Sequence, residues 1–303
     1  MIGTLRHRVV VNPVSGNGRG RRIGKMLPEI FARLGLAAEF HVSSTAQHFS
    51  ELVRSHRSEE GQRVVICGGD GSLNMALDSM EPGRGPPLAL VPCGRGNDIA
   101  RSLGIPQAPE AAAGLLVEGS EGPMDVGYVG ERPFASIAAM GFDSFVTMAA
   151  SRMRRVRGRL VYVVAALKEL ARFTPPEFSI VSDTFRFRGR AMMVSVANAP
   201  YYGGGMRLSP TSVMDDGLME ICVVLPMSKL NLLRLLPRVF SGGHVDSPLF
   251  MTAPVRRARI ASTPRVPVCA DGEYLASSPV DIRVERGAAR IVSPCANSGR
   301  APQ

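Results

Sequence analysis

The amino-acid sequence predicts an α/β domain with a doubly wound, mostly parallel sheet, followed by a β-sandwich domain. In the first part of the chain, short apolar runs alternate with segments of helical periodicity, and glycine-rich turns follow several of the runs. Past residue 127 the pattern changes to closely spaced strands separated by turn residues. We therefore expect domains at 1–127 and 128–292 and a polar tail at 293–303.

The first domain is expected to contain parallel strands that alternate with helices. Apolar runs predict strands at Arg8–Asn12, Ala37–Val42, Val64–Cys67 and Leu88–Val91. Pro28 lies inside the first predicted helix, so that helix should start late or kink. Later helices are expected up to about Arg57, from Ser72 onward, over Ile99–Leu103 and over Glu110–Val117.

The second domain is expected to be built mainly from strands. They are predicted at Phe134–Ala139, Glu177–Val181, Thr184–Phe187, Ala191–Ala197, Gly217–Val224, Arg256–Ser262 and Val266–Ala270. Two helical segments, Asp143–Arg172 and Ser228–Phe240, interrupt them. This spacing of short strands favours a β-sandwich.

Composition narrows the class of protein and the expected partners. The 303-residue chain carries a net charge of +10, mostly from arginine, which attracts nucleic acid, anionic lipid headgroups or nucleotides. The chain has no tryptophan and no recognisable nucleic-acid module, so nucleic acid is not an expected partner.

The sequence also bears on the cellular compartment. No apolar run approaches the roughly 20 residues of a membrane span, and the N-terminus runs into its first strand without a secretory segment. Cys67, Cys93, Cys222, Cys269 and Cys295 are scattered without CxxC spacing, which indicates reduced thiols. We expect a cytoplasmic protein.

The stretch Val64–Leu77 carries the strongest chemical signal. An apolar strand ends in Gly68-Gly69-Asp70-Gly71, and a helix opens at Ser72. Glycines let the backbone N–H groups approach a large anion, and the helix N-terminus adds positive dipole. Asp70 would repel phosphate unless a cation lay between them, so the pattern favours a Mg²⁺-nucleotide site. Taken alone, the motif would be better interpreted as a tight β–α turn with an aspartate cap, and the motifs that follow decide against that interpretation.

Two further glycine-containing loops follow the carboxyl ends of predicted strands. They are Asn12–Gly16 and Gly94–Asp98. Ligands of open parallel sheets bind at the carboxyl ends of the strands, so the three loops should form one site. Neither a Walker A loop nor a GxGxxG motif is present.

Together, GGDGS at 68–72, NPVSG at 12–16 and PCGRGND at 92–98 resemble the diacylglycerol kinase catalytic-domain superfamily of bacterial lipid kinases, sphingosine kinases and ceramide kinases. The resemblance continues through 197–221, with its Asn, Gly-Gly-Gly and Asp-Gly-Leu elements, and into Asp271-Gly272-Glu273. It implies ATP-dependent phosphorylation of a lipid hydroxyl, with the active site in a cleft between an α/β nucleotide domain and a β-sandwich.

The resemblance assigns roles residue by residue. The nucleotide-binding positions are Asn12, Pro13, Ser15, Gly16, Ser43, Gly68, Gly69, Asp70, Gly71, Ser72, Asn74, Gly94, Arg95 and Asn97. Ser43 and Ser72 stand where the family usually has threonine, so a hydroxyl is kept at both. Asp70, Asp98 and Asp125 match the acids that hold catalytic Mg²⁺ through waters.

A second, structural Mg²⁺ is implied at Val213, Asp216 and Leu218. There Asp216 would give a carboxylate and the other two would give backbone carbonyls. Asp215-Asp216-Gly217 is equally an ordinary turn before a strand.

Arg95 departs from the family pattern, which has threonine there. Its guanidinium fork suits an altered contact with the ATP phosphates, the reading we favour, but an arginine there could also block the site or mark a lost activity. Glu273 and Asp271 are the candidates for the base that takes the proton from the lipid hydroxyl, and Glu273 is preferred by position.

The sequence therefore predicts an ATP- and Mg²⁺-dependent lipid kinase of the diacylglycerol or sphingoid type. Its lipid substrate lies in a membrane surface, so peripheral association with the inner membrane face is expected, and a homodimer is left open. Arg152, Arg154, Arg155, Arg157 and Arg159 form a basic run that is either a solvated helix face or a contact for anionic lipid. The alternatives are a catalytically weak nucleotide-binding regulator and a kinase of a non-lipid alcohol.

Overall fold

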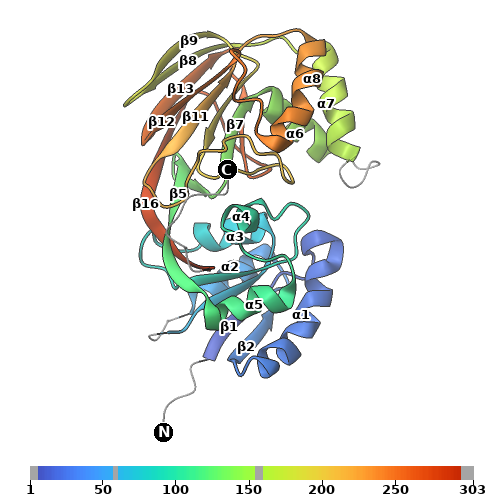
Figure 1. Ribbon diagram of the computed structural model, residues 1–303, viewed down its shortest axis with the longest axis vertical. Helices are drawn as coiled ribbons and strands as arrows, with labels where there is room; N and C mark the ends of the chain where they lie inside the picture. Colours follow the sequence, from blue (N-terminus) through green and yellow to red (C-terminus); the bar gives the residue numbers. More distant parts are fainter. Residues whose placement is uncertain (1–5, 57–60, 154–159, 295–303) are drawn as a thin grey trace. The chain divides into compact units, whose positions relative to one another are not determined.

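The chain divides into two compact units. The structure is a computed structural model that describes residues 6–56, 61–153 and 160–294. Unit 1 comprises Met1–Asp125 and Arg286–Gln303, and unit 2 comprises Val126–Glu285 (Figure 1). None of the described helices has the length and hydropathy needed to cross a membrane.

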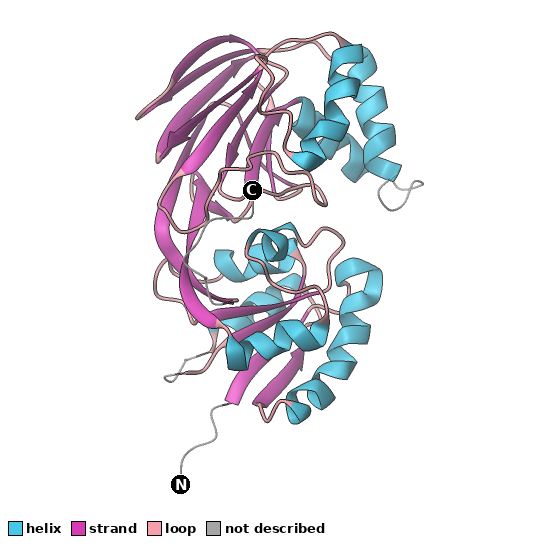
Figure 2. Ribbon diagram, in the orientation of Figure 1, coloured by secondary structure: helices cyan, strands magenta, loops and turns pink. Residues whose placement is uncertain are grey.

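Unit 1 is built on a parallel sheet with strand order β2-β1-β3-β4-β16. The strands are β1 (Arg6–Val11), β2 (Ala37–Val42), β3 (Val64–Gly68), β4 (Leu88–Pro92) and the end of β16 (Val280–Ser293). The helices are α1 (Ser15–Arg33), α2 (Ala46–Arg54), α3 (Asp70–Asp78), α4 (Asp98–Ser102) and α5 (Pro109–Glu118) (Figure 2). Helix α1 packs with α5 and α2 with α3, as expected for a doubly wound sheet.

The core of unit 1 explains why its strands are continuous apolar runs. Every residue of β3 and of β4 is buried, because helices cover both faces of a parallel sheet. Backbone pairing extends past the strands, where Asn12 N donates to Cys67 O at 3.0 Å and Cys93 N to Gly68 O at 2.8 Å. The loops that follow β1, β3 and β4 therefore start from adjacent positions.

Unit 2 is a sandwich of two mainly antiparallel sheets. One has the order β16-β13-β8-β9, and the other has β12-β11-β10-β7-β14-β15. The strands of the second sheet are β7 (Ile137–Gly141), β10 (Met193–Ala197), β11 (Met219–Val224), β12 (Phe250–Val255), β14 (Pro267–Ala270) and β15 (Glu273–Ser277). Besides β16, the strands of the first sheet are β8 (Glu177–Ser182), β9 (Arg186–Arg190) and β13 (Arg257–Thr263).

Alternating side chains on β10 show how unit 2 is layered. Val194 and Val196 face the core between the sheets, whereas Met193 and Ala197 join a second cluster with Leu232. The helices α6 (Phe142–Arg152), α7 (Leu160–Arg172) and α8 (Lys229–Ser241) pack on that side. The fold class predicted from the sequence, α/β followed by a β-sandwich, is confirmed.

Several predicted elements differ from those observed. The single helix expected at Asp143–Arg172 is two helices, because Met153 adopts an extended conformation at the end of α6. Of the predicted basic run, only Arg152 lies within the described residues. Strands β5 (Ser120–Val129), β6 (Arg132–Phe134), β12, β15 and β16 were not expected, and residues from 286 onward belong to unit 1 instead of the sandwich.

The first helix begins late, as the sequence predicts. Gly16, Asn17 and Gly18 have φ angles of +59°, +59° and +89°, so regular helical geometry starts after them. Pro28 lies well inside the helix that follows. The departure from helical geometry therefore lies in the glycine-rich loop and not at the proline.

Asp143, near the start of α6, is a partly buried acid that the sequence did not single out. The Tyr202 hydroxyl lies 3.4 Å from Asp143 Oδ1, and burial raises the pKa of Asp143 to about 6. The native state therefore binds this proton more tightly than the unfolded chain. Its ionisation lowers the free energy of unfolding as pH rises from about 4 to about 6, and the loss persists above that range.

We expect Asp143→Asn to stabilise the protein at pH 8 by up to about 3 kcal/mol, because asparagine keeps an acceptor for Tyr202 without a buried charge. The gain should fall to about half at pH 5. Urea denaturation of both proteins at the two pH values checks this. An equal change in unfolding free energy at both would contradict it.

Candidate phosphate-loop site

The loops after β3 and β4 touch backbone to backbone. A Cβ built on Gly69 would lie 2.8 Å from Gly94 Cα, and one on Gly94 would lie 2.7 Å from Gly69 Cα. No side chain fits at either position without separating the loops. Gly68–Ser72 and Gly94–Asp98 were predicted to share one site, and the structure brings the two loops together.

The loop after β1 joins the same cluster. A Cβ on Gly16 would lie 2.0 Å from Cys93 O, and the φ angle of Gly16 is +59°. One on Gly20 would lie equally close to Asn12 O, at 2.0 Å. Asn12 Nδ2 donates to Ser72 Oγ at 3.0 Å and links this loop to the start of α3. Three loops thus form one glycine-rich surface at the carboxyl ends of adjacent strands.

Ser43 and Asn97 have structural contacts within this region. Ser43 Oγ donates to Val11 O at 3.1 Å and is buried at the end of β2. Asn97, with a φ of +52°, donates from Nδ2 to Gln107 Oε1 at 2.8 Å. Both side chains hold loop ends in place, so direct nucleotide contact by them stays a prediction.

Asp70 and Asp98 converge on Gly96. Oδ2 of Asp98 and Oδ2 of Asp70 lie 3.1 and 3.2 Å from the position of a Cβ on Gly96. Asp70 Oδ1 accepts from Ile99 N at 3.0 Å, and Asp98 Oδ1 pairs with Arg101 Nη1 at 2.5 Å. Oδ1 of each acid is therefore held by a neighbouring group. The two Oδ2 atoms suit a hydrated Mg²⁺, which needs few direct carboxylates.

The third predicted metal acid, Asp125, is fully buried on β5. Asp125 Oδ1 accepts from Gly287 N at 2.7 Å and ties β5 to β16. Among the described residues, no group of three or more His, Cys, Asp or Glu side chains is placed to hold a metal directly. Metal binding through waters at Asp70, Asp98 and Asp125 stays a prediction.

Arginines hold the loop between β4 and α4 from two sides. Arg101 Nη2 donates to Gly96 O at 3.3 Å, and Arg19 Nη1 donates to Gly94 O at 3.4 Å. Neither arginine was predicted from the sequence, although both lie within a few residues of the motifs. Arg95 is exposed and makes no hydrogen bond or ion pair with another described residue. Its guanidinium is thus available to a ligand.

In unit 2 the two candidate bases have different surroundings. The Asp271 carboxylate accepts from the backbone N–H groups of Ala135 (2.8 Å), Ser136 (3.1 Å) and Ile137 (3.1 Å). Glu273 is exposed at the start of β15. The contacts give Asp271 a structural role, and the assignment of Glu273 as the base stays a prediction.

Asn198 completes the support of the segment that Asp271 holds. It is buried, and its Nδ2 donates to Ala135 O at 2.9 Å. Ser136 Oγ donates to Tyr201 O at 2.9 Å in the same region. These contacts explain locally why asparagine and aspartate occur at these motif positions.

The predicted structural Mg²⁺ position lies on an exposed turn. Asp216 Oδ1 accepts from Leu218 N at 2.8 Å, which is an Asx turn, and Val213 is 48% exposed. This contact matches the ordinary-turn alternative. A metal at Val213, Asp216 and Leu218 stays a prediction.

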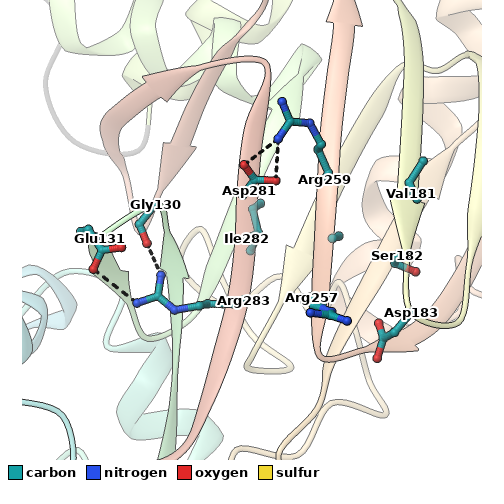
Figure 3. A pocket seen from close by; sticks show the side chains of 11 residues that line it. Gly130, Glu131, Val181, Ser182, Asp183, Arg257, Arg259, Asp281, Ile282 and Arg283 are labelled. Carbon is teal, nitrogen blue, oxygen red and sulfur yellow. Dashed lines mark hydrogen bonds and ion pairs between the residues drawn. The ribbon is translucent and has the colours of Figure 1, made fainter.

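A shallow depression of about 600 Å³ lies on the β8–β13–β16 sheet of unit 2 (Figure 3). Arg259 pairs with Asp281 at 3.0 Å, and Arg283 pairs with Glu131 at 3.4 Å. Arg259 and Arg283 are therefore paired with acids, and Arg257 also lines the depression. None of the predicted site residues lines this depression.

Comparisons with known proteins agree with this organisation. Residues 6–129 match the diacylglycerol kinase catalytic domain, and residues 136–293 match the YegS C-terminal NAD kinase beta sandwich-like domain. The chain is 32% identical to a diacylglycerol kinase of Mycobacterium tuberculosis over 94% of each chain. It is 25% identical to a diacylglycerol kinase of Bacillus subtilis, covering 89% of this chain and 90% of the relative.

Solved structures share the fold. A diacylglycerol kinase from Bacillus anthracis aligns with a TM-score of 0.77 at 20% identity, over 97% of this chain and 98% of that one. An NAD kinase from Archaeoglobus fulgidus aligns with a TM-score of 0.50 at 15% identity, over 95% and 92%. With the two matched domains and the relative at 32% identity, the chain belongs to the diacylglycerol kinase family, together with YegS-like lipid kinases.

Proposed function

We propose that the protein phosphorylates a lipid hydroxyl of the diacylglycerol or sphingoid type, using ATP and Mg²⁺. The observation that carries the proposal is the packing of three glycine-rich loops with two converging carboxylates, Asp70 and Asp98, at adjacent strand ends. The names of the relatives support a lipid acceptor. The basic character of the chain, with a net charge of +10, suits both the nucleotide and an anionic membrane.

Each group of site residues has its own role in the proposed phosphoryl transfer. Backbone groups of Gly68–Ser72 and Gly94–Asn97 receive the phosphates at the α3 N-terminus, where no side chain caps the helix. Asp70 and Asp98 would hold Mg²⁺ through waters, with Asp125 as the third predicted acid. A bound Mg²⁺ would neutralise charge on the transferring phosphoryl group. Glu273 would take the proton from the acceptor hydroxyl.

Transfer of label from γ-labelled ATP to a mixed-micelle lipid panel tests the proposal. We expect a labelled lipid that disappears on chelation of Mg²⁺ and in Asp70→Ala. Glu273→Ala should lower kcat by about 10² or more, the usual contribution of a general base. Glu177→Ala, an exposed strand glutamate on β8, should leave transfer unchanged.

Each negative result of the label-transfer assay would indicate a different function. ATP binding without any labelled lipid would contradict lipid phosphorylation. Label on a soluble alcohol would then identify a kinase of a non-lipid alcohol, and absence of any acceptor would identify a nucleotide-binding regulator.

Arg95 is proposed to contact the ATP phosphates, because it is exposed beside Gly94 and free of partners among the described residues. Arg95→Ala should weaken ATP binding about tenfold, the worth of one charge-assisted hydrogen bond. Titration calorimetry with Arg54→Ala, an exposed arginine on α2, as the control measures this. Unchanged affinity would contradict the contact, and higher activity in Arg95→Thr would favour the regulator.

Helices α7 and α8 are proposed to contact an anionic membrane. Leu230, Leu233 and Phe240 are 57%, 41% and 57% exposed and form a stripe along α8. On α7, Val163 and Leu167 are 53% and 54% exposed. The two helices meet where Lys229 Nζ donates to Ala171 O at 2.5 Å.

The charges of these helices favour anionic lipid. Helix α8 has no acidic residue, and exposed Lys229, Arg234 and Arg238 flank its stripe. The one acid of α7, Glu169, is paired with Arg172. An apolar stripe bordered by basic residues is the pattern of interfacial helices.

We expect Leu233→Glu combined with Phe240→Glu to reduce co-sedimentation with phosphatidylglycerol-containing vesicles at least about tenfold, from lost burial and added repulsion. Val181→Glu, which alters an exposed apolar residue on β8, is the matched control. Equal retention of both variants would contradict the assignment.

A further inference from the structure

Two thiols that the proposed reaction does not use lie directly beneath the phosphate loops. Cys67 is in β3 next to Gly68, and Cys93 follows β4 next to Gly94. Their Sγ atoms are 4.0 Å apart, with Cys67 donating to Cys93, and both side chains are fully buried. Cys67 lies in β3 and Cys93 lies one residue past the adjacent strand β4, and their sulfur atoms face each other.

The two thiols differ in their chemistry. The hydrogen bond from Cys67 lowers the pKa of Cys93, and a hydrogen bond from Ser15 and the charge of Arg19 act in the same direction. The same hydrogen bond, together with burial, raises the pKa of Cys67. Cys93 is thus the member of the pair that loses its proton more readily, and Cys67 is the member that holds its proton more tightly.

Little free space surrounds this pair. A disulfide has an S–S length of about 2.05 Å, so the sulfurs must approach by about 2 Å. A Cβ on Gly16 would lie 2.0 Å from Cys93 O, and one on Gly20 would lie 3.4 Å from Cys93 Sγ. Movement of Cys93 therefore displaces the loop after β1 and the Gly69–Gly94 contact.

We propose that Cys67 and Cys93 are a site of reversible oxidation, at which a disulfide disorganises the phosphate loops. The oxidant is a peroxide, which reaches the buried pair during local opening of the loops. The Cys93 thiolate attacks one peroxide oxygen, giving a sulfenic acid and releasing hydroxide. The Cys67 thiol then displaces the sulfenic hydroxyl, so that one S–S bond forms, water leaves and the peroxide is reduced. A small thiol reverses the bond by exchange.

The experiment treats the full chain with hydrogen peroxide and maps disulfides by peptide mass spectrometry, in a Cys295→Ser background that removes the tail thiol. We expect a Cys67–Cys93 linked peptide that dithiothreitol releases. Cys222→Ser should still form it, whereas Cys67→Ser and Cys93→Ser should not. Cys222 and Cys269 are matched controls, because burial raises the pKa of each to about 12 and neither has a thiol partner among the described residues.

Two measurements report whether the disulfide disorganises the phosphate loops. Hydrogen–deuterium exchange of peptides covering 68–76 and 93–101 should rise on oxidation, independently of any ligand. ATP affinity, which rests on the proposed function, should fall about tenfold or more and recover on reduction. Both effects should be absent in Cys67→Ser and Cys93→Ser, each compared with its own reduced form.

Two results would overturn the inference. One is free Cys67 and Cys93 thiols after peroxide treatment that oxidises the exposed methionines. The other is a mapped Cys67–Cys93 disulfide with unchanged exchange in both loop peptides. Failure of ATP to bind the reduced protein would instead count against the proposed function, and the exchange readout would still decide the inference.

Discussion

The close approach of three backbone loops in unit 1 constrains the rest of that unit. Gly69 and Gly94 leave no room for a Cβ between them, and Gly16 leaves none against the Cys93 carbonyl. The ladder hydrogen bonds from Asn12 to Cys67 and from Cys93 to Gly68 carry strand pairing up to these loops. The register of β1, β3 and β4 and the shape of the phosphate surface therefore depend on one another. A side chain added at any of these glycines would disturb the ladder as well as the loop.

In unit 2, a side chain and not a backbone contact fixes the corresponding loop. The turn between β14 and β15 places Asp271 at a φ of +50°, from which its carboxylate accepts three backbone N–H groups of 135–137. From the sequence, Glu273 was preferred over Asp271 only by its position in the motif, because two carboxylates two residues apart look alike without their partners. The hydrogen bonds separate them: one acid organises the segment before β7, and the other remains exposed. The motif thus combines a structural position, Asp271, with an exposed carboxylate, Glu273.

The sequence predicted the elements whose signal is local. Strands β3 and β4 are uninterrupted apolar runs, and their bounds agree with the predicted ones to within a residue. Strand β16 was missed because arginine and glutamate interrupt its apolar residues and its pairing with β13 and β4 is distant in sequence. The same limit applies to the site. Gly-rich loops after strands predicted where phosphate would bind, but the ion pair of Asp98 with Arg101 appears only once the loop is folded.

Most basic residues of the chain are arginines, and the arginines near the loops have different contacts. Arg101 and Arg19 donate to the Gly96 and Gly94 carbonyls, so part of the positive charge near the loops maintains their shape. Arg95, between those glycines, faces solvent instead. A loop that binds anions needs carbonyl oxygens turned away from the ligand and at least one cation left uncommitted. Arg101 and Arg19 meet the first need through their bonds to Gly96 O and Gly94 O, and Arg95 is the exposed cation that our proposal assigns to the second.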